Sequence, residues 1–307
     1  MKLLKFGGTS VGNADGLRSL SFIVEEAARD DRIVVVVSAL GGVTDTLVSL
    51  LDQAPHGIDA SAAEQALYSR HHVLAGSVLA SDSLEEYAVH LQQELRSARR
   101  LLDQLQTVTP SPALRDEILA IGERLSAPLV AAALEERGLK AVAQDARTLL
   151  RTNSDFGNAL IEMADTERLA RAWFGQLPPD VIPVVTGFIA SDAEGRTTTL
   201  GRGGSDYTAA LLARALGARV LERWTDVEGL YTDDPRLFPN AKPLRKIDLA
   251  DAQALAHAGR LGMHSRALDP LVAANIPLHV RCTRKPQGRG TLITPANYTS
   301  SIRSLAS

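Results

Sequence analysis

MKLLKFGGTSVG, residues 1–12, is a short apolar run that contains Lys5 and ends in a glycine pair followed by hydroxyl side chains. This order is typical of a buried parallel strand that leads into a loop and a helix. A second apolar run, IVVVVSAL, occupies Ile33–Leu40. Between the two runs, Asn13–Asp31 has apolar residues at helical spacing, and its first residue can cap a helix. The sequence therefore predicts a strand–helix–strand unit at the start of the chain.

The rest of the chain continues this alternation of helices and apolar strands. We expect residues 43–137 to be mostly helical, ending in one helix over Ser111–Gly138 with its final glycine as the stop signal. Further strands are expected at Lys140–Gln144, Val181–Ile189, Arg219–Trp224 and Pro277–Cys282. Further helices are expected at Ser205–Leu216 and Asp248–Ala258, and a polar hairpin at Ser191–Leu200. This pattern predicts an α/β fold with a mainly parallel sheet.

Composition narrows the class of protein. The 307 residues are 45% hydrophobic, which is enough for one large α/β domain or two smaller ones. A net charge of −3 without a basic stripe argues against nucleic acid or a membrane surface as a partner. No apolar stretch approaches the roughly 20 residues of a membrane span, and no signal-peptide pattern is present, so we expect a cytoplasmic protein. The single cysteine, Cys282, excludes an intrachain disulfide, and the histidine spacing predicts no metal site.

Three stretches are richer in glycine and hydroxyl residues than ordinary turns require: Lys5–Gly12, Ser38–Asp45 and Leu200–Ala213. Each would present backbone amides beside a helix N-terminus, which is where phosphates and carboxylates bind. A parallel sheet would bring such strand ends to one edge, so an anion site is favoured over purely structural turns. A fourth stretch, Trp224–Lys242, is a long acidic loop after a strand, which is either functional or a solvated turn. None of the four matches a P-loop or a dinucleotide fingerprint.

Four motifs occur here in one order: KFGGTSV, VVSALGGVTD, TLGRGGSDYTAALLA and WTDVEGLYTDDPR. Together they resemble aspartate kinase (aspartokinase), a member of the amino-acid kinase superfamily, over residues 1–293. The resemblance implies a three-layer α/β/α sandwich around a mainly parallel sheet of about eight strands. It implies a kinase domain over residues 1–295. About 1–195 would bind the amino acid, about 196–295 would bind the nucleotide, and 296–307 would form a flexible tail.

The activity implied by the resemblance is transfer of phosphate from ATP to the side-chain carboxylate of L-aspartate. The product, 4-phospho-L-aspartate, begins lysine, threonine and methionine biosynthesis. An aspartate side chain has a pKa of about 3.9, so the acceptor is already ionised and needs no general base. It needs cations, amides and Mg²⁺ to stabilise the transferring phosphoryl group, and the metal would be held mainly by the nucleotide phosphates. Two alternatives remain: a related kinase for another carboxylate, and a non-catalytic sensor of nucleotide or amino acid.

The resemblance also assigns site residues. Lys5 and Asp206 would be catalytic, Lys5 as the cation at the phosphates; the sequence has only six lysines against 27 arginines, so a lysine at a strand end is informative in itself. Aspartate would be bound by Thr44, Glu123, Phe188, Arg202 and Ser205. The nucleotide would be bound by Gly7, Gly8, Thr9, Ser10, Thr225, Asp226, Tyr231 and Arg236. Taken alone, Glu123 would be interpreted as a helix-surface acid and Phe188 as a core residue.

The chain departs from the family pattern in AGRLGMHSRALDP, residues 258–270. Leu261 stands where the family has a nucleotide-binding lysine, and Ser265 where it has proline. Arg260 is one residue away, which is about 100° of rotation on a helix, so it is not a direct replacement for that lysine. Lys242, Lys246 and Arg266 are further candidates to compensate.

A second departure is at the C-terminus. Many family members continue into ACT regulatory domains, and the printed chain does not reach them. It would therefore be a kinase without that module or one domain of a longer, fused enzyme. A homodimer is among the assemblies that the resemblance allows.

Overall fold

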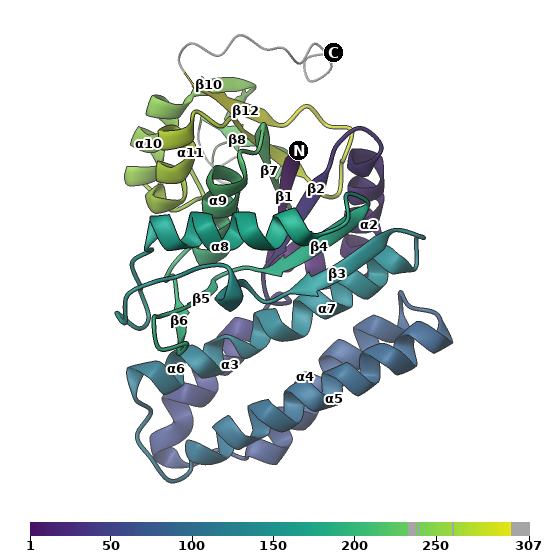
Figure 1. Cartoon of the computed structure of the whole chain (residues 1–307), viewed down its shortest axis with the longest axis vertical. Helices are drawn as coiled ribbons and strands as arrows, with labels where there is room; N and C mark the ends of the chain where they lie inside the picture. The colour runs from purple at the N-terminus through teal and green to yellow at the C-terminus, as the bar shows by residue number, and fades with distance from the viewer. Residues whose placement is uncertain (233–237, 239, 260, 296–307) are drawn as a thin grey trace.

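The computed structural model describes residues 1–232, 238, 240–259 and 261–295, so the expected tail lies outside the described residues (Figure 1). Within them, eight strands form a central sheet: β1 (Lys2–Phe6), β2 (Ile33–Val37), β3 (Lys140–Gln144), β4 (Val181–Thr186), β7 (Val220–Thr225), β10 (Lys246–Asp248), β11 (Leu278–Cys282) and β12 (Thr291–Thr294). Their order across the sheet is β10–β12–β11–β7–β1–β2–β4–β3, and every neighbouring pair is parallel except β11 and β12. The expected α/β class and mainly parallel sheet are confirmed.

Helices cover both faces of this sheet (Figure 1). One face carries α2 (Ala14–Ala28) and α7 (Ile121–Glu135), with α3 (Val43–Gln53), α4 (Ala60–Gly76), α5 (Ser81–Gln104) and α6 (Pro112–Leu119) beyond them. The other face carries α8 (Met163–Gln176), α9 (Gly204–Leu216), α10 (Leu249–His257) and α11 (Asp269–Ala274). Shorter elements are the helix α1 (Gly8–Val11), the 3-10 turns Ala54–His56, Ala146–Thr148 and Ser265–Ala267, and the two-stranded sheets β5 (Ile189–Ser191) with β6 (Thr197–Thr199) and β8 (Leu230–Tyr231) with β9 (Pro243–Leu244).

The strand sequences explain why the sheet lies between two cores. Successive side chains of a strand point to opposite faces. Leu4 and Phe6 of β1 accordingly join the core under α2 and α7, whereas Leu3 joins Leu221 of β7 in the core under α9. All five residues of β2 are buried, as expected for a strand covered on both faces. Among the described residues, no helix combines the length and the apolar composition needed to cross a bilayer.

Most expected elements are present, and two predictions were wrong in detail. The strand expected over Val181–Ile189 ends at Thr186, because the chain turns there before β5. The single helix expected over Ser111–Gly138 is two helices that meet at Ala120. The two halves pack on different partners, α6 on β6 and α3 but α7 on β3 and β4. The break at Ala120 therefore allows α6 and α7 to pack against different elements.

Candidate active site

The carboxyl ends of four central strands meet at one edge of the sheet. Phe6, the last residue of β1, is aligned with Val37 of β2 and with Trp224 of β7, and Val37 is aligned with Thr186 of β4. The loops that follow these strands therefore start at the same level. This edge is where open α/β sheets bind their ligands, and it is where the sequence predicted the anion site.

The first two glycine-rich loops are in direct contact. The amide of Gly41 donates to the carbonyl of Gly8 at 2.9 Å. A Cβ on Gly8 would lie 2.9 Å from the carbonyl oxygen of Ala39, which is closer than side chains approach backbone. Glycine at position 8 therefore allows the two loops to approach, and the short helix α1 begins at this contact.

A buried ion pair joins the two predicted catalytic residues. Nζ of Lys5, on β1, lies 2.8 Å from Oδ1 of Asp206, in the first turn of α9. The second carboxylate oxygen, Oδ2, accepts a hydrogen bond from Nε of Arg223 at 3.1 Å. Burial by itself would raise the pKa of Asp206, but Arg223 and Lys5 outweigh that effect and hold it below its usual value. Asp206 is therefore an ionised carboxylate whose two oxygens each meet a cation.

A cavity of about 460 Å³ opens beside this pair. All of the predicted catalytic and aspartate-binding residues line it: Lys5, Asp206, Thr44, Glu123, Phe188, Arg202 and Ser205. They come from β1, α3, α7, α9 and the loops after β4 and β6, so the fold unites residues that are up to about two hundred positions apart in sequence.

Glu123 is the most unusual titratable group in the cavity. It lies in the first turn of α7 and is only 3% exposed. Its Oε1 accepts from the amide of Ala39 at 3.1 Å, whereas its Oε2 has no hydrogen-bond partner among the described residues. Burial raises the pKa of Glu123 to about 8, and the Ala39 hydrogen bond and the nearby Lys5 offset this only in part. Such a carboxyl group is ready for a cationic ligand group in the cavity.

Arg202 is the opposite case, a cation without an internal partner. It is exposed at the cavity, and no hydrogen bond or ion pair joins it to another described residue. It lies between Gly201 and Gly203, whose φ angles of 71° and 73° are in the left-handed region. This backbone path turns the loop directly before α9, and it leaves the guanidinium available for an anion from solution.

Phe188 forms part of the cavity wall with a strained backbone. Its φ angle of 69° is unusual for a bulky side chain. The amide of Phe188 donates to Oγ1 of Thr208 at 3.0 Å, and its carbonyl accepts from the amide of Leu200 at 2.9 Å, so two hydrogen bonds hold this conformation. Strained residues that are fixed in this way are common at functional sites.

The predicted nucleotide-binding residues that the structure describes lie at or after neighbouring strands. Thr9, Ser10 and Asp226 line a second hollow of about 370 Å³, where Oγ of Ser10 is 2.7 Å from Oγ1 of Thr283. The others are placed as follows: Gly7 precedes α1 beside the Lys5 ammonium, Gly8 begins α1, Thr225 ends β7, Tyr231 lies on β8, and Arg236 falls outside the described residues.

In the segment that lacks the family lysine, Leu261 is buried in the core under α9. Of the candidate replacements, Arg260 lies outside the described residues. Arg266 is engaged elsewhere, because it donates to Oδ1 of Asn158 and to the carbonyl of Ala159. Lys242 and Lys246 line neither the cavity nor the second hollow, and Lys246 is on the far edge strand β10.

Sequence reasoning missed Asp116, a buried carboxylate behind the cavity. Its Oδ2 accepts from the amides of Gly157 and Thr199 at 2.8 and 2.7 Å, and its Oδ1 accepts from Oγ1 of Thr199 at 2.9 Å. Both partners line the cavity. Asp116 therefore fixes two parts of the wall, a role for which its position in LRDEIL gives no signal.

Replacing Asp116 with alanine is expected to lower the free energy of unfolding by about 3 kcal/mol, because the two buried donors of Thr199 and the partly buried amide of Gly157 lose their acceptor. Asp116→Asn keeps an acceptor for the two amides and is the matched control, with an expected loss of less than about half that amount. Urea unfolding of the two variants and the wild type measures the difference. Equal stability of Asp116→Ala and the wild type would contradict this role.

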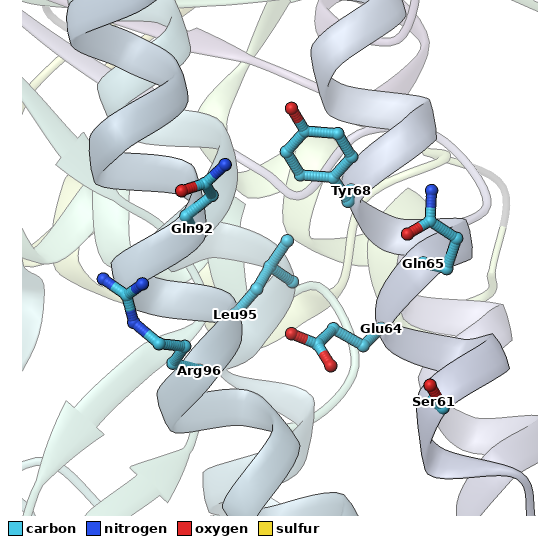
Figure 2. Close-up of a pocket in the computed structure, with 7 residues that line it drawn as sticks. All are labelled: Ser61, Glu64, Gln65, Tyr68, Gln92, Leu95 and Arg96. Carbon is cyan, nitrogen blue, oxygen red and sulfur yellow. The ribbon is translucent and has the colours of Figure 1, made fainter.

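No group of three or more His, Cys, Asp or Glu side chains that could hold a metal ion occurs in the part of the chain that the structure describes. A hollow of about 450 Å³ lies between α4 and α5, and its lining includes Glu64 and Tyr68 on one helix and Leu95 and Arg96 on the other (Figure 2). None of the predicted site residues lines this hollow.

Comparisons with known proteins show which sequences and folds this chain resembles. The model of the amino acid kinase family matches residues 1–282. Lysine-sensitive aspartokinase 3 of Escherichia coli strain K12 is 36% identical over 290 residues, which is 94% of this chain and 63% of that protein. The chloroplastic bifunctional aspartokinase/homoserine dehydrogenase 2 of Arabidopsis thaliana is 31% identical over 94% of this chain and 32% of its own length.

Among solved structures, the crystal structure of E. coli aspartokinase III in complex with aspartate and ADP (R-state) superposes with a TM-score of 0.87 at 35% identity. It covers 98% of this chain and 65% of that chain. The chain thus spans less than two thirds of the length of each of these relatives.

Proposed function

The chain belongs to the amino acid kinase family, and we propose that it transfers the terminal phosphoryl group of ATP to the side-chain carboxylate of L-aspartate. One observation carries the proposal. A single cavity combines the Lys5–Asp206 ion pair with a buried carboxyl oxygen on Glu123 and a guanidinium on Arg202, neither of which has a partner among the residues that the structure describes. These are the groups that an amino acid with two carboxylates and one ammonium requires. The similarity to aspartokinases, one of them solved with aspartate and ADP, supports the same acceptor.

In this proposal the side chains of the cavity orient aspartate for in-line attack. Arg202 binds one carboxylate, Glu123 binds the ammonium, and Phe188 limits the length of the acceptor. An oxygen of the side-chain carboxylate forms a bond to the γ-phosphorus while the bond to the β,γ-bridging oxygen breaks, so that 4-phospho-L-aspartate and ADP result. No proton has to be removed from the acceptor, so the chain's contribution is charge and position.

The charges that would meet the phosphates come from β1 and the loop after it. Lys5 supplies a compact ammonium, and Gly7, Gly8 and the amides of α1 allow phosphate oxygens to approach the backbone closely. Magnesium, carried by the nucleotide phosphates, would neutralise part of their charge when bound. Asp206 is paired with cations on both oxygens, and this favours a role in holding those cations.

The acceptor is tested by measuring ADP release with MgATP and L-aspartate, L-glutamate or N-acetylglutamate, and by trapping the acyl phosphate with hydroxylamine. We expect turnover with aspartate and the aspartyl hydroxamate as product, as required for the first step of lysine, threonine and methionine biosynthesis. Turnover with another acceptor but not with aspartate would overturn the substrate assignment. Binding of both ligands without turnover would favour a sensor.

Arg202→Ala is expected to raise the KM for aspartate by about 10- to 100-fold, because a bidentate carboxylate contact is lost, with a smaller change in kcat. Steady-state kinetics over a range of aspartate concentrations at saturating MgATP measures this split. Arg168→Ala removes another exposed guanidinium, on α8 and outside the cavity lining, and should leave both constants unchanged. A fall in kcat at unchanged KM would assign Arg202 to the phosphoryl-transfer step instead.

A further inference from the structure

Arg223 is a charged residue beside the reaction centre that the sequence motifs do not include and to which the proposed function gives no role of its own. It lies on β7 directly beside Lys5 on β1, because the parallel register aligns these two residues. Aligned residues of neighbouring strands point to the same face, and this face is the one that α9 covers with Asp206. Two adjacent strands thus bring two cations to one carboxylate.

The guanidinium is held at both ends. Its Nε donates to Oδ2 of Asp206 at 3.1 Å, and its Nη2 donates to the carbonyl of Gly262 at 2.9 Å. The Arg223 side chain is 16% exposed and that of Asp206 is 8% exposed, so the contact is largely shielded from water. Gly262 is the residue after Leu261, in the segment between α10 and the turn Ser265–Ala267. Arg223 therefore connects the catalytic carboxylate to that segment.

The arrangement matters because of the charge that a nucleotide brings. Lys5 and Asp206 alone form a neutral pair, and Lys5 is already bound to a carboxylate 2.8 Å away. If Lys5 turned toward a phosphate, Asp206 would become a buried charge without a partner, which is strongly unfavourable. With Arg223 on the other oxygen, Asp206 keeps a partner when Lys5 leaves. The three groups together also carry a formal charge of +1, which attracts phosphate.

We propose that Arg223 is a positioning residue of the phosphoryl-transfer site, which neutralises Asp206 so that Lys5 is free to bind the nucleotide phosphates. The inference rests on the part of the proposed function in which the chain binds a nucleotide, and it does not depend on which acceptor is phosphorylated. Arg223 acts through Asp206 and Lys5, since it does not line the cavity itself.

The test is calorimetric titration of the protein with ADP and MgCl2 in the absence of aspartate, followed by a separate titration with aspartate. Arg223→Met is expected to weaken ADP binding by about tenfold or more, whereas aspartate binding stays within about threefold. Arg223→Lys keeps the charge and should bind ADP within about threefold of the wild type. Arg219→Met is the matched control, because Arg219 directly precedes β7 and pairs with Asp31 away from the cavity.

Each outcome decides the proposal. Wild-type ADP affinity in Arg223→Met overturns it, and so does an equal loss of ADP and aspartate affinity, which indicates a purely structural role. If Arg223→Lys loses as much ADP affinity as Arg223→Met, the positive charge of Arg223 does not support ADP binding and the proposal is overturned. If Arg223→Met does not fold, Arg223→Gln, which retains a donor for Gly262 without the charge, must lose ADP affinity, and normal affinity would overturn the proposal. A wild type that binds ADP but does not phosphorylate aspartate contradicts the proposed function and leaves this comparison intact.

Discussion

Replacing Lys5 with alanine is expected to lower kcat on the order of 10²-fold or more, because the ammonium that meets charge developing on the phosphoryl group is removed. The structure adds a second reason. Without Lys5, the buried centre contains only Asp206 and Arg223, whose charges cancel, so the net attraction for phosphate is lost. The KM for aspartate should change by only a few-fold, since Arg202 and Glu123 are retained. The measurement is steady-state ADP release with both substrates varied.

Lys2→Ala supplies the matched control for this experiment. Lys2 is on the same strand at its other end, where its Nζ is 3.4 Å from Asp31, so the variant loses an equal charge away from the cavity. Lys2→Ala should retain wild-type kcat. Turnover of Lys5→Ala within a few-fold of the wild type, in a protein with an unchanged circular dichroism spectrum, would remove Lys5 from the mechanism.

Most strand ends were predictable from sequence because they depend on local patterns, although β4 ends at Thr186 and not at the expected Ile189. An apolar run followed by glycine fixes where a buried strand stops, and the parallel order brings such stops to one edge. Lys5, Thr44, Glu123 and Arg202 were assigned by motif resemblance, and they do line one cavity. The motifs could not show which residues, far apart in the sequence, contact each other in the fold. Arg223 is an ordinary strand residue in the sequence, and only the register of β7 on β1 reveals its contact with Asp206.

The conformation of Phe188 shows a second limit of local rules. In the dipeptide Gly187–Phe188, the glycine would be expected to take the left-handed backbone. In the structure, Phe188 adopts the left-handed backbone conformation instead, with a φ angle of 69°. Gly187 is required for space, because a Cβ there would lie 2.6 Å from Cβ of Ser205 and 2.9 Å from the carbonyl oxygen of Val37. Since both contacts are between residues far apart in sequence, no turn rule identifies them.

Glu123→Gln is expected to weaken aspartate binding by about 100-fold, because a buried carboxylate that pairs with the substrate ammonium is replaced by a neutral amide.

The same Glu123→Gln change should stabilise the free protein at alkaline pH. The pKa of Glu123 is about 8 in the folded chain, against its usual 4.5. The folded state therefore retains a proton that the unfolded state releases, so stability falls as pH rises from 4.5 to 8, by an amount on the order of 5 kcal/mol. Glutamine removes this slope, so the variant should exceed the wild type in stability above pH 8 and match it near pH 5.

The same proton links aspartate binding to pH. If the ammonium binds the ionised form of Glu123, binding near pH 7 must release a proton, and wild-type affinity should rise up to about tenfold per pH unit until pH 8. Calorimetric titrations in buffers of different ionisation enthalpy count the released proton, and Glu123→Gln should release none. Constant wild-type affinity between pH 6 and 8, or wild-type affinity in the variant, would contradict this role. A variant that binds aspartate poorly yet unfolds at higher urea concentration at pH 8.5 would indicate that the buried carboxyl group lowers the stability of the free protein and serves the ligand.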